Sequence, residues 1–73
     1  MNSHAKIDID CTIEKETQAA MLIRCIDPNT DTDIDEYMLV WIPLSQVFSI
    51  IRYTDGNCRV NMSKWIAEKK GLV

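Results

Sequence analysis

The chain has 73 residues, of which 47% are hydrophobic and 26% are charged, and its formal net charge is −3 at pH 7. This length allows one domain with a small core, and the hydrophobic content excludes a disordered chain. The acidic balance disfavours general binding to duplex nucleic acid, which depends on clustered Lys and Arg. Since no stretch has the apolar length of a membrane-spanning helix or the apolar core of a signal peptide, we expect no membrane contact and a cytoplasmic location.

The first part of the chain predicts two strands. We expect residues 1–6 to form a flexible N-terminus and residues 7–73 to form a single domain. Residues 7–14 alternate between apolar and polar side chains, which is the period of a half-buried strand. A second strand over residues 19–26 would direct Met21, Ile23 and Cys25 to the core together with Ala19. Helix is the alternative for this segment, because Ala, Met, Leu and Arg also favour helices.

An acidic loop and a strand that ends in proline follow. Residues 27–36 contain five acids and no base. Residues 37–42 predict a third strand with apolar side chains on both faces, and Pro43 ends it because proline cannot donate to a ladder. Residues 44–46 predict a single helical turn. The side chains expected opposite the core face form an apolar surplus, which either the terminal helix covers or a partner binds: Leu22, Ile26, Met38, Val40 and Ile42.

The C-terminal part predicts a hairpin and a helix. Residues 47–53 and 58–62 are expected to be strands joined by the Asp55-Gly56 turn, which favours a type I′ hairpin. Residues 63–70 predict a short helix that Ser63 caps and Gly71 ends. Because so short a helix is not stable alone, we expect Trp65 and Ile66 to pack it onto the sheet, with Leu72 helping.

These elements predict a mainly β fold, namely a small five-stranded barrel of the OB-like or SH3-like type with a short C-terminal helix. The helical turn between the third and fourth strands favours the OB-like arrangement, in which a helix occupies that position.

The side chains that carry chemistry do not form a catalytic or metal-binding pattern. Cys11, Cys25 and Cys58 lack the paired spacing of a metal site and fall on the apolar faces of the predicted strands. We expect them to be buried thiols in a reducing compartment. The single histidine, His4, lies in the N-terminal segment, away from any cysteine. The sequence therefore predicts no enzyme, no cofactor and no metal.

An acidic surface with aromatic anchors is the first candidate binding site. Acidic side chains would dock on a basic protein surface, or imitate nucleic-acid phosphates in a binding groove, and charge complementarity steers the choice of partner. Aromatic side chains supply most of the affinity in such interfaces. The candidate partner-binding residues are Asp31, Asp33, Asp35, Glu36, Tyr37 and Trp41.

A single-stranded nucleic-acid site is the alternative, because OB-like barrels combine stacking aromatic rings with basic side chains. The candidate residues for this role are Arg24, Arg52, Arg59 and Trp41, with Tyr37, Phe48 and Tyr53 as further aromatic rings. The acidic net charge counts against it.

Two short motifs resemble small accessory proteins encoded by phages and prophages. The first, Trp41-Ile42-Pro43-Leu44-Ser45-Gln46-Val47, has the pattern W-x-P-x-S-Q at a strand end. The second is the closing helix, Lys64-Trp65-Ile66-Ala67-Glu68-Lys69-Lys70-Gly71-Leu72. The likeness covers residues 19–73. Leu44 stands where a lysine is common in these proteins, which weakens a nucleic-acid role, and Ser63 stands where a proline often precedes the helix. The resemblance implies a non-enzymatic protein of a virus or mobile element, located in the host cytoplasm.

Together, the composition and the resemblance predict a non-catalytic protein-interaction module of a phage or prophage. It would inhibit a host protein, for example a defence or nucleic-acid-handling complex, by covering a site through its acidic surface. The alternative function is single-stranded nucleic-acid binding by an OB-like protein. Self-association into a homodimer is a further expectation, because it would relieve the small core.

Overall fold

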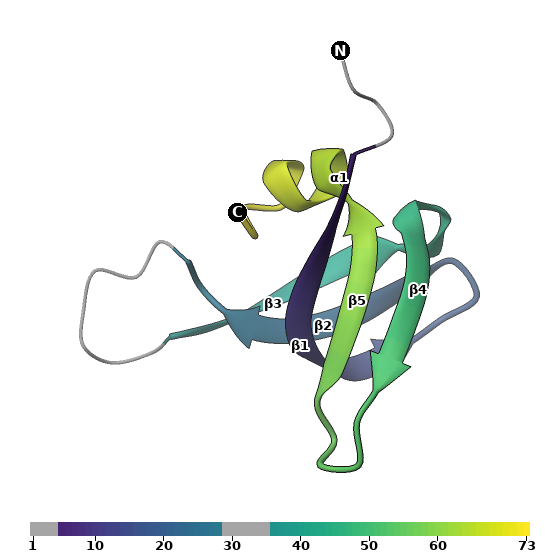
Figure 1. The fold of residues 1–73 in the computed structure, drawn as a ribbon, viewed down its shortest axis with the longest axis vertical. Coiled ribbons are helices and arrows are strands. Elements are labelled where there is room, and N and C mark those ends of the chain that lie inside the picture. The colour runs from purple at the N-terminus through teal and green to yellow at the C-terminus, as the bar shows by residue number, and fades with distance from the viewer. Residues whose placement is uncertain (1–4, 29–35) are drawn as a thin grey trace.

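The computed structural model describes residues 5–28 and 36–73 and shows one antiparallel sheet of five strands with a short C-terminal helix (Figure 1). The elements are β1 (Lys6–Glu16), β2 (Ala20–Ile26), β3 (Tyr37–Pro43), the 3₁₀ turn η1 (Leu44–Gln46), β4 (Val47–Arg52), β5 (Cys58–Ser63) and α1 (Lys64–Lys69). The predicted mainly β class, with its terminal helix, is confirmed, and residues 20–26 are strand rather than helix. Lys6, which we assigned to the N-terminus, is already the first residue of β1.

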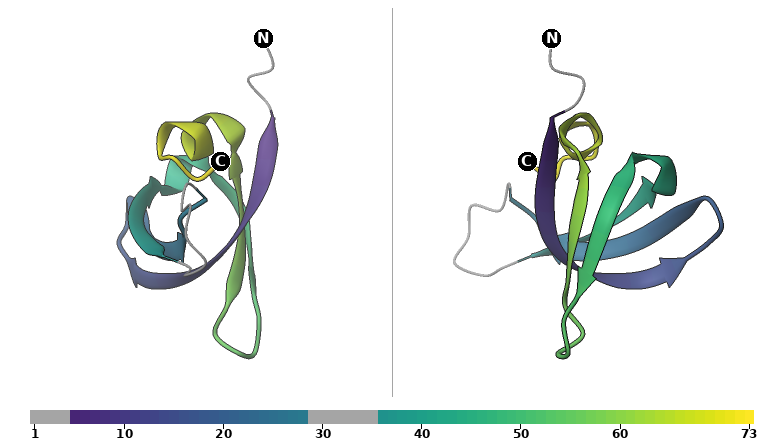
Figure 2. Two further views of the ribbon diagram at one scale, coloured as in Figure 1. Left: turned by 90° about the vertical axis from the view of Figure 1, so that its left-hand side faces the viewer. Right: turned by 45° about the vertical axis from the view of Figure 1, so that its right-hand side comes forward.

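Strand β1 lies at the centre of the sheet, whose order is β3-β2-β1-β5-β4. Residues Lys6 to Cys11 pair with β5, whereas Thr12 to Glu16 pair with β2. The sheet therefore bends at the middle of β1 into two halves that enclose the core (Figures 1 and 2). The edge strands β3 and β4 are connected by η1 but are not neighbours in the sheet, so the sheet is not closed into a barrel.

The inward face of β3 differs from the prediction. Met38, Val40 and Ile42 lie opposite Cys25, Ile23 and Met21 of β2, and directly opposed residues share a face of the sheet. Val40 and Ile42 are consequently buried, and Met38 packs against the same core. The expectation that these three side chains lie opposite the core was therefore wrong, whereas Leu22 and Ile26 do lie on the outer face.

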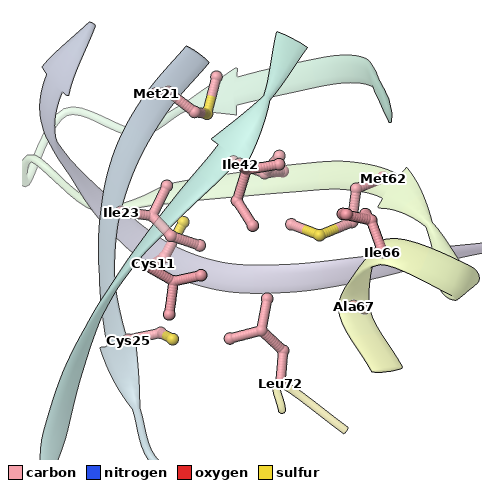
Figure 3. Packing of buried hydrophobic residues seen from close by; sticks show 11 residues of the cluster. Cys11, Met21, Ile23, Cys25, Ile42, Met62, Ile66, Ala67 and Leu72 are labelled. Atoms are coloured by element: carbon pink, nitrogen blue, oxygen red, sulfur yellow. The ribbon is translucent and has the colours of Figure 1, made fainter. Parts of the chain in front are cut away.

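Helix α1 covers one open end of the core, opposite the end where the β4–β5 hairpin lies (Figures 1 and 2). Ile66, Ala67 and Leu72 point toward Met62 and Ile42 in the interior (Figure 3). Trp65, by contrast, is 58% exposed and stacks with Lys69 one turn later, with the ammonium 5.0 Å from the ring centre. The prediction that Ile66 and Leu72 attach the helix is confirmed, and the same prediction for Trp65 was wrong.

Ser63 marks the start of α1 and Gly71 marks its end, as predicted. The hydroxyl of Ser63 accepts a hydrogen bond from the Ile66 amide at 3.2 Å and donates one to Oε1 of Gln46 at 2.8 Å. The first bond caps the helix, and the second fixes η1 beside its N-terminus. Gly71 has a φ of +78°, the left-handed conformation that ends a helix, and the following amide of Leu72 donates to Ala67.

The β4–β5 turn also differs in detail from the prediction. A type I′ turn needs two consecutive positive φ angles, but Gly56 is the only one of its four residues, 54–57, with a positive φ. Tyr53 and Asn57 close the loop with a bond of 2.9 Å from the Tyr53 amide to the Asn57 carbonyl, and the Gly56 amide donates to the Tyr53 carbonyl. Between this closing pair lie three loop residues, 54–56, the last of which is the left-handed glycine.

Candidate binding surface

The outer side of the β2–β3 hairpin carries a row of exposed apolar side chains. Tyr37, Leu39 and Trp41 alternate along β3 and are 63%, 61% and 43% exposed. Tyr37 lies opposite Ile26 of β2, and Trp41 lies opposite Leu22. We call this surface the β2–β3 face; it consists of Leu22, Ile26, Tyr37, Leu39 and Trp41, with Arg24 at its centre.

The amino-acid pattern of β3 accounts for this exposure. A strand with one solvated face normally alternates apolar and polar residues, but β3 is apolar at every position from Tyr37 to Pro43. One half of its side chains fills the core, and the other half must face outward. Contiguous exposed apolar side chains are uncommon on isolated domains and mark interaction sites.

The structure brings part of the predicted partner-binding set together. Tyr37 and Trp41 share the β2–β3 face, and Leu39 lies between them, a residue that we did not single out from the sequence. Glu36 is exposed and directly precedes β3, where its carbonyl accepts a bond of 2.7 Å from the Asp27 amide. Asp31, Asp33 and Asp35 lie outside the described residues.

The three arginines of the alternative nucleic-acid site are each paired with a carboxylate. The closest nitrogen–oxygen distances are 3.7 Å for Arg24 and Glu14, 2.6 Å for Arg52 and Glu16, and 2.9 Å for Arg59 and Asp10. The hydrogen bond from Arg59 lowers the pKa of Asp10. Arg24 also lies over the ring of Tyr37, 5.2 Å from its centre. Each ion pair is exposed and weak, but the phosphates of a nucleic acid would have to displace a carboxylate at each of the three arginines.

A groove of about 550 Å³ lies where β1 passes from its pairing with β5 to its pairing with β2. Tyr37, Tyr53, Arg24 and Arg59 line it together with Asp10. Two of the arginines and two of the aromatic rings from the alternative set therefore meet, whereas Arg52 and Trp41 do not line this groove. The groove could not be predicted from the sequence, because it depends on which strands diverge from β1.

The three cysteines are free, buried thiols, as predicted. Cys11 and Cys58 lie opposite each other on β1 and β5, and Cys25 faces the same core. Burial, with smaller contributions from Cys58, Cys25 and Asp10, raises the pKa of Cys11 to about 12, and burial also raises the pKa of Cys25. Cys11 therefore stays protonated at neutral pH and is a poor nucleophile.

The raised pKa of Cys11 predicts a loss of stability at high pH. The unfolded chain releases this proton near the ordinary pKa of 9.0, whereas the folded protein keeps it up to about 12. Between these values, deprotonation of the unfolded chain lowers the free energy of unfolding. The stabilising contribution of the protonated Cys11 thiol is therefore fully present below pH 9 and is lost as the pH rises through the folded pKa. Urea unfolding from pH 7 to 12 should show a steeper decline for the wild type than for Cys11→Ala; equal declines would contradict the assignment.

Comparisons with protein-family models, with curated proteins and with solved structures gave no match. In residues 5–28 and 36–73, no group of three or more His, Cys, Asp or Glu side chains is arranged to hold a metal ion. Over the same residues, none of the helices has the length and apolar character needed to cross a membrane.

Proposed function

We propose that this chain is a non-catalytic protein-interaction module, and that it inhibits a host protein by covering one of that protein's sites. The observation that carries the proposal is the row of Tyr37, Leu39 and Trp41, which presents two aromatic rings and a leucine on one face of an edge strand. Interfaces draw most of their affinity from such anchors, and an aromatic side chain keeps few rotatable bonds to immobilise.

Acidic side chains in the segment that precedes β3 in the sequence would select the partner. Glu36 is exposed at the start of β3, and the segment of residues 27–36 carries five acids and no base. Acidic side chains speed the association with a basic surface and repel other acidic surfaces. The partner would therefore present an apolar pocket with basic side chains beside it, and basic surface patches are typical of proteins that bind nucleic acid. The resemblance of the two motifs to phage proteins suggests a host protein of this kind, in the host cytoplasm.

The test compares capture of a host protein by matched variants of the full chain. Tyr37→Ser combined with Trp41→Ser should lower capture at least tenfold, because it removes both anchors of the β2–β3 face. Trp65→Ser is the control, since Trp65 is similarly exposed but lies on α1. Pull-down from host lysate, followed by mass spectrometry and titration with the purified partner, measures the difference. Equal loss for both variants would contradict a specific role for the β2–β3 face.

The acidic contribution has a separate test. Replacing Asp31, Asp33, Asp35 and Glu36 with Asn or Ser should weaken binding and remove most of its dependence on salt, because charge steering is screened by ions. Unchanged binding would remove the acids from the proposal while leaving the apolar anchors in place.

Single-stranded nucleic-acid binding is the second candidate, because the groove places Arg24 and Arg59 beside Tyr37 and Tyr53. Stacking rings and cations are what such sites combine. The ion pairs of both arginines and the net charge of −3 oppose it. Titration of a labelled oligonucleotide at low salt separates the two candidate functions. If the protein does not bind the oligonucleotide at tens of micromolar protein, nucleic-acid binding is excluded.

A further inference from the structure

Strand β3 forms one edge of the sheet. Among residues 5–28 and 36–73, its backbone hydrogen-bonds to β2 and to no other segment. It forms seven consecutive pairs with β2 without a register shift, whereas the other edge, β4, has an irregularity between Val47 and Ser49. Native edges are commonly blocked by charged side chains, bulges or prolines. From Tyr37 to Ile42, β3 contains none of these, and Pro43 stands only at its end.

The register identifies which backbone groups face the free edge. The Asp27 amide bonds the Glu36 carbonyl at one end of the hairpin, and the Leu44 amide bonds the Ala19 carbonyl at the other. Bonded and non-bonded pairs alternate along an antiparallel ladder, so both ends require that Met38, Val40 and Ile42 bond β2. Pro43 then falls at a non-bonded position, as its missing amide hydrogen demands.

The N–H and C=O groups directed away from β2 consequently belong to Tyr37, Leu39 and Trp41. These are the same residues whose side chains form the exposed row. One strand segment therefore offers three donors, three acceptors and three apolar side chains to whatever lies beside it.

We propose that a second copy of this chain pairs with this edge, with its β3 antiparallel to the first and a two-fold axis at Leu39. In this register Leu39 lies opposite Leu39 of the second copy, and Tyr37 lies opposite Trp41 of the second copy. Every donor and acceptor of the three residues is satisfied in both copies. Aromatic residues directly opposed on neighbouring strands stabilise a sheet, and a two-fold interface is self-complementary.

Neighbouring registers fit less well. An axis at Val40 would place Tyr37 opposite Pro43, which has no N–H to donate. An axis at Met38 would place Trp41 opposite a position before the start of the second copy's β3. The Leu39 register is thus the one in which Tyr37, Leu39 and Trp41 pair only among themselves and leave none of their backbone donors and acceptors unbonded.

The charge distribution also favours a second copy in this orientation. Asp27 and Glu36 lie at the start of β3, whereas η1 at its end is bonded through Gln46 to Ser63, which pairs with Lys6 and is followed by Lys64. Antiparallel pairing directs the acidic end of one copy toward the basic end of the other. A parallel arrangement would bring like charges together. The β2–β3 faces of the two copies would then form one continuous apolar surface. The pairing of the two β3 edges does not depend on the proposed function.

Cross-linking tests the register directly. In Leu39→Cys protein, a short thiol-to-thiol cross-linker should join the two copies, because the introduced thiols lie opposite each other across the axis. In the control Trp41→Cys, the two thiols would be four residues apart along the strands, about 13 Å, and should stay unlinked. The native cysteines are buried and do not compete. Equal cross-linking of both variants, or of neither, would overturn the proposed register.

Light scattering of the wild type tests the dimer itself. The wild type should have the mass of two chains, and Leu39→Pro should have half that mass, because proline removes an edge N–H without breaking a bond to β2. Leu39→Ser keeps the N–H and should remain mainly dimeric. A wild type that is monomeric at the concentrations used for NMR would overturn the proposal and leave this edge to an extended segment of another protein. A dimeric wild type that captures no host protein would refute only the proposed function.

Discussion

Ile66→Ala is expected to destabilise the domain by about 2–5 kcal/mol, whereas Trp65→Ala should cost less than about 1 kcal/mol. Ile66 is 3% exposed and lies among Met62, Ala67 and Leu72, where truncation leaves a cavity at the end of the core. Trp65 would lose only its exposed stacking with Lys69. Urea unfolding followed by far-UV circular dichroism measures both, since this signal comes mainly from the backbone rather than from tryptophan.

The two variants distinguish closely placed side chains, because Trp65 and Ile66 are neighbours on the same short helix. Helix α1 has six residues and no stability of its own, so its attachment depends on the few side chains that enter the core. Lys64→Ala, one residue earlier and exposed, is the control for changes in helix propensity. A larger effect of Trp65→Ala than of Ile66→Ala would mean that the helix is attached through its tryptophan.

Local pattern was sufficient for much of the fold. Alternation in residues 7–14 identified the buried side of β1, and Ser63 and Gly71 marked the ends of α1, because these signals depend on neighbours in the sequence. The inward face of β3 was not predictable in this way. Because every position of β3 is apolar, the sequence pattern does not show which side chains face the core. Only the pairing of Val40 with Ile23 determines this.

The helix and the candidate site show the same limit. A helix of six residues makes fewer than two turns, so the sequence cannot say whether Trp65 or Ile66 points inward. Tyr37 and Trp41 were identified from residue type, but Leu39 was overlooked because a leucine in an apolar strand is normally core. The pairing of Arg59 with Asp10 was equally hidden, because these residues meet only through the register of β1 and β5.

Val40→Asp and Leu39→Asp are expected to have opposite outcomes, although the residues are adjacent. Val40 is 7% exposed and faces Ile23, so an aspartate there would place a carboxylate in the core without a cation. The cost of an unpaired buried charge is comparable to the whole stability of a domain this size, roughly 4–11 kcal/mol, and the variant should be unfolded. Leu39→Asp should fold, with a loss of about 1 kcal/mol from lower strand propensity.

Two-dimensional amide NMR spectra distinguish these outcomes, because an unfolded chain loses the dispersion of a β-sheet. Val40→Thr is the matched control: it nearly keeps the volume of valine and exchanges one methyl group for a hydroxyl, so it should fold with a smaller loss of stability than Val40→Asp. A folded Val40→Asp variant beside an unfolded Leu39→Asp variant would reverse the inward face of β3. That result would also move Tyr37 and Trp41 into the core, because residues two and four apart on a strand share a face. The exposed row on which the binding proposal depends would then not exist.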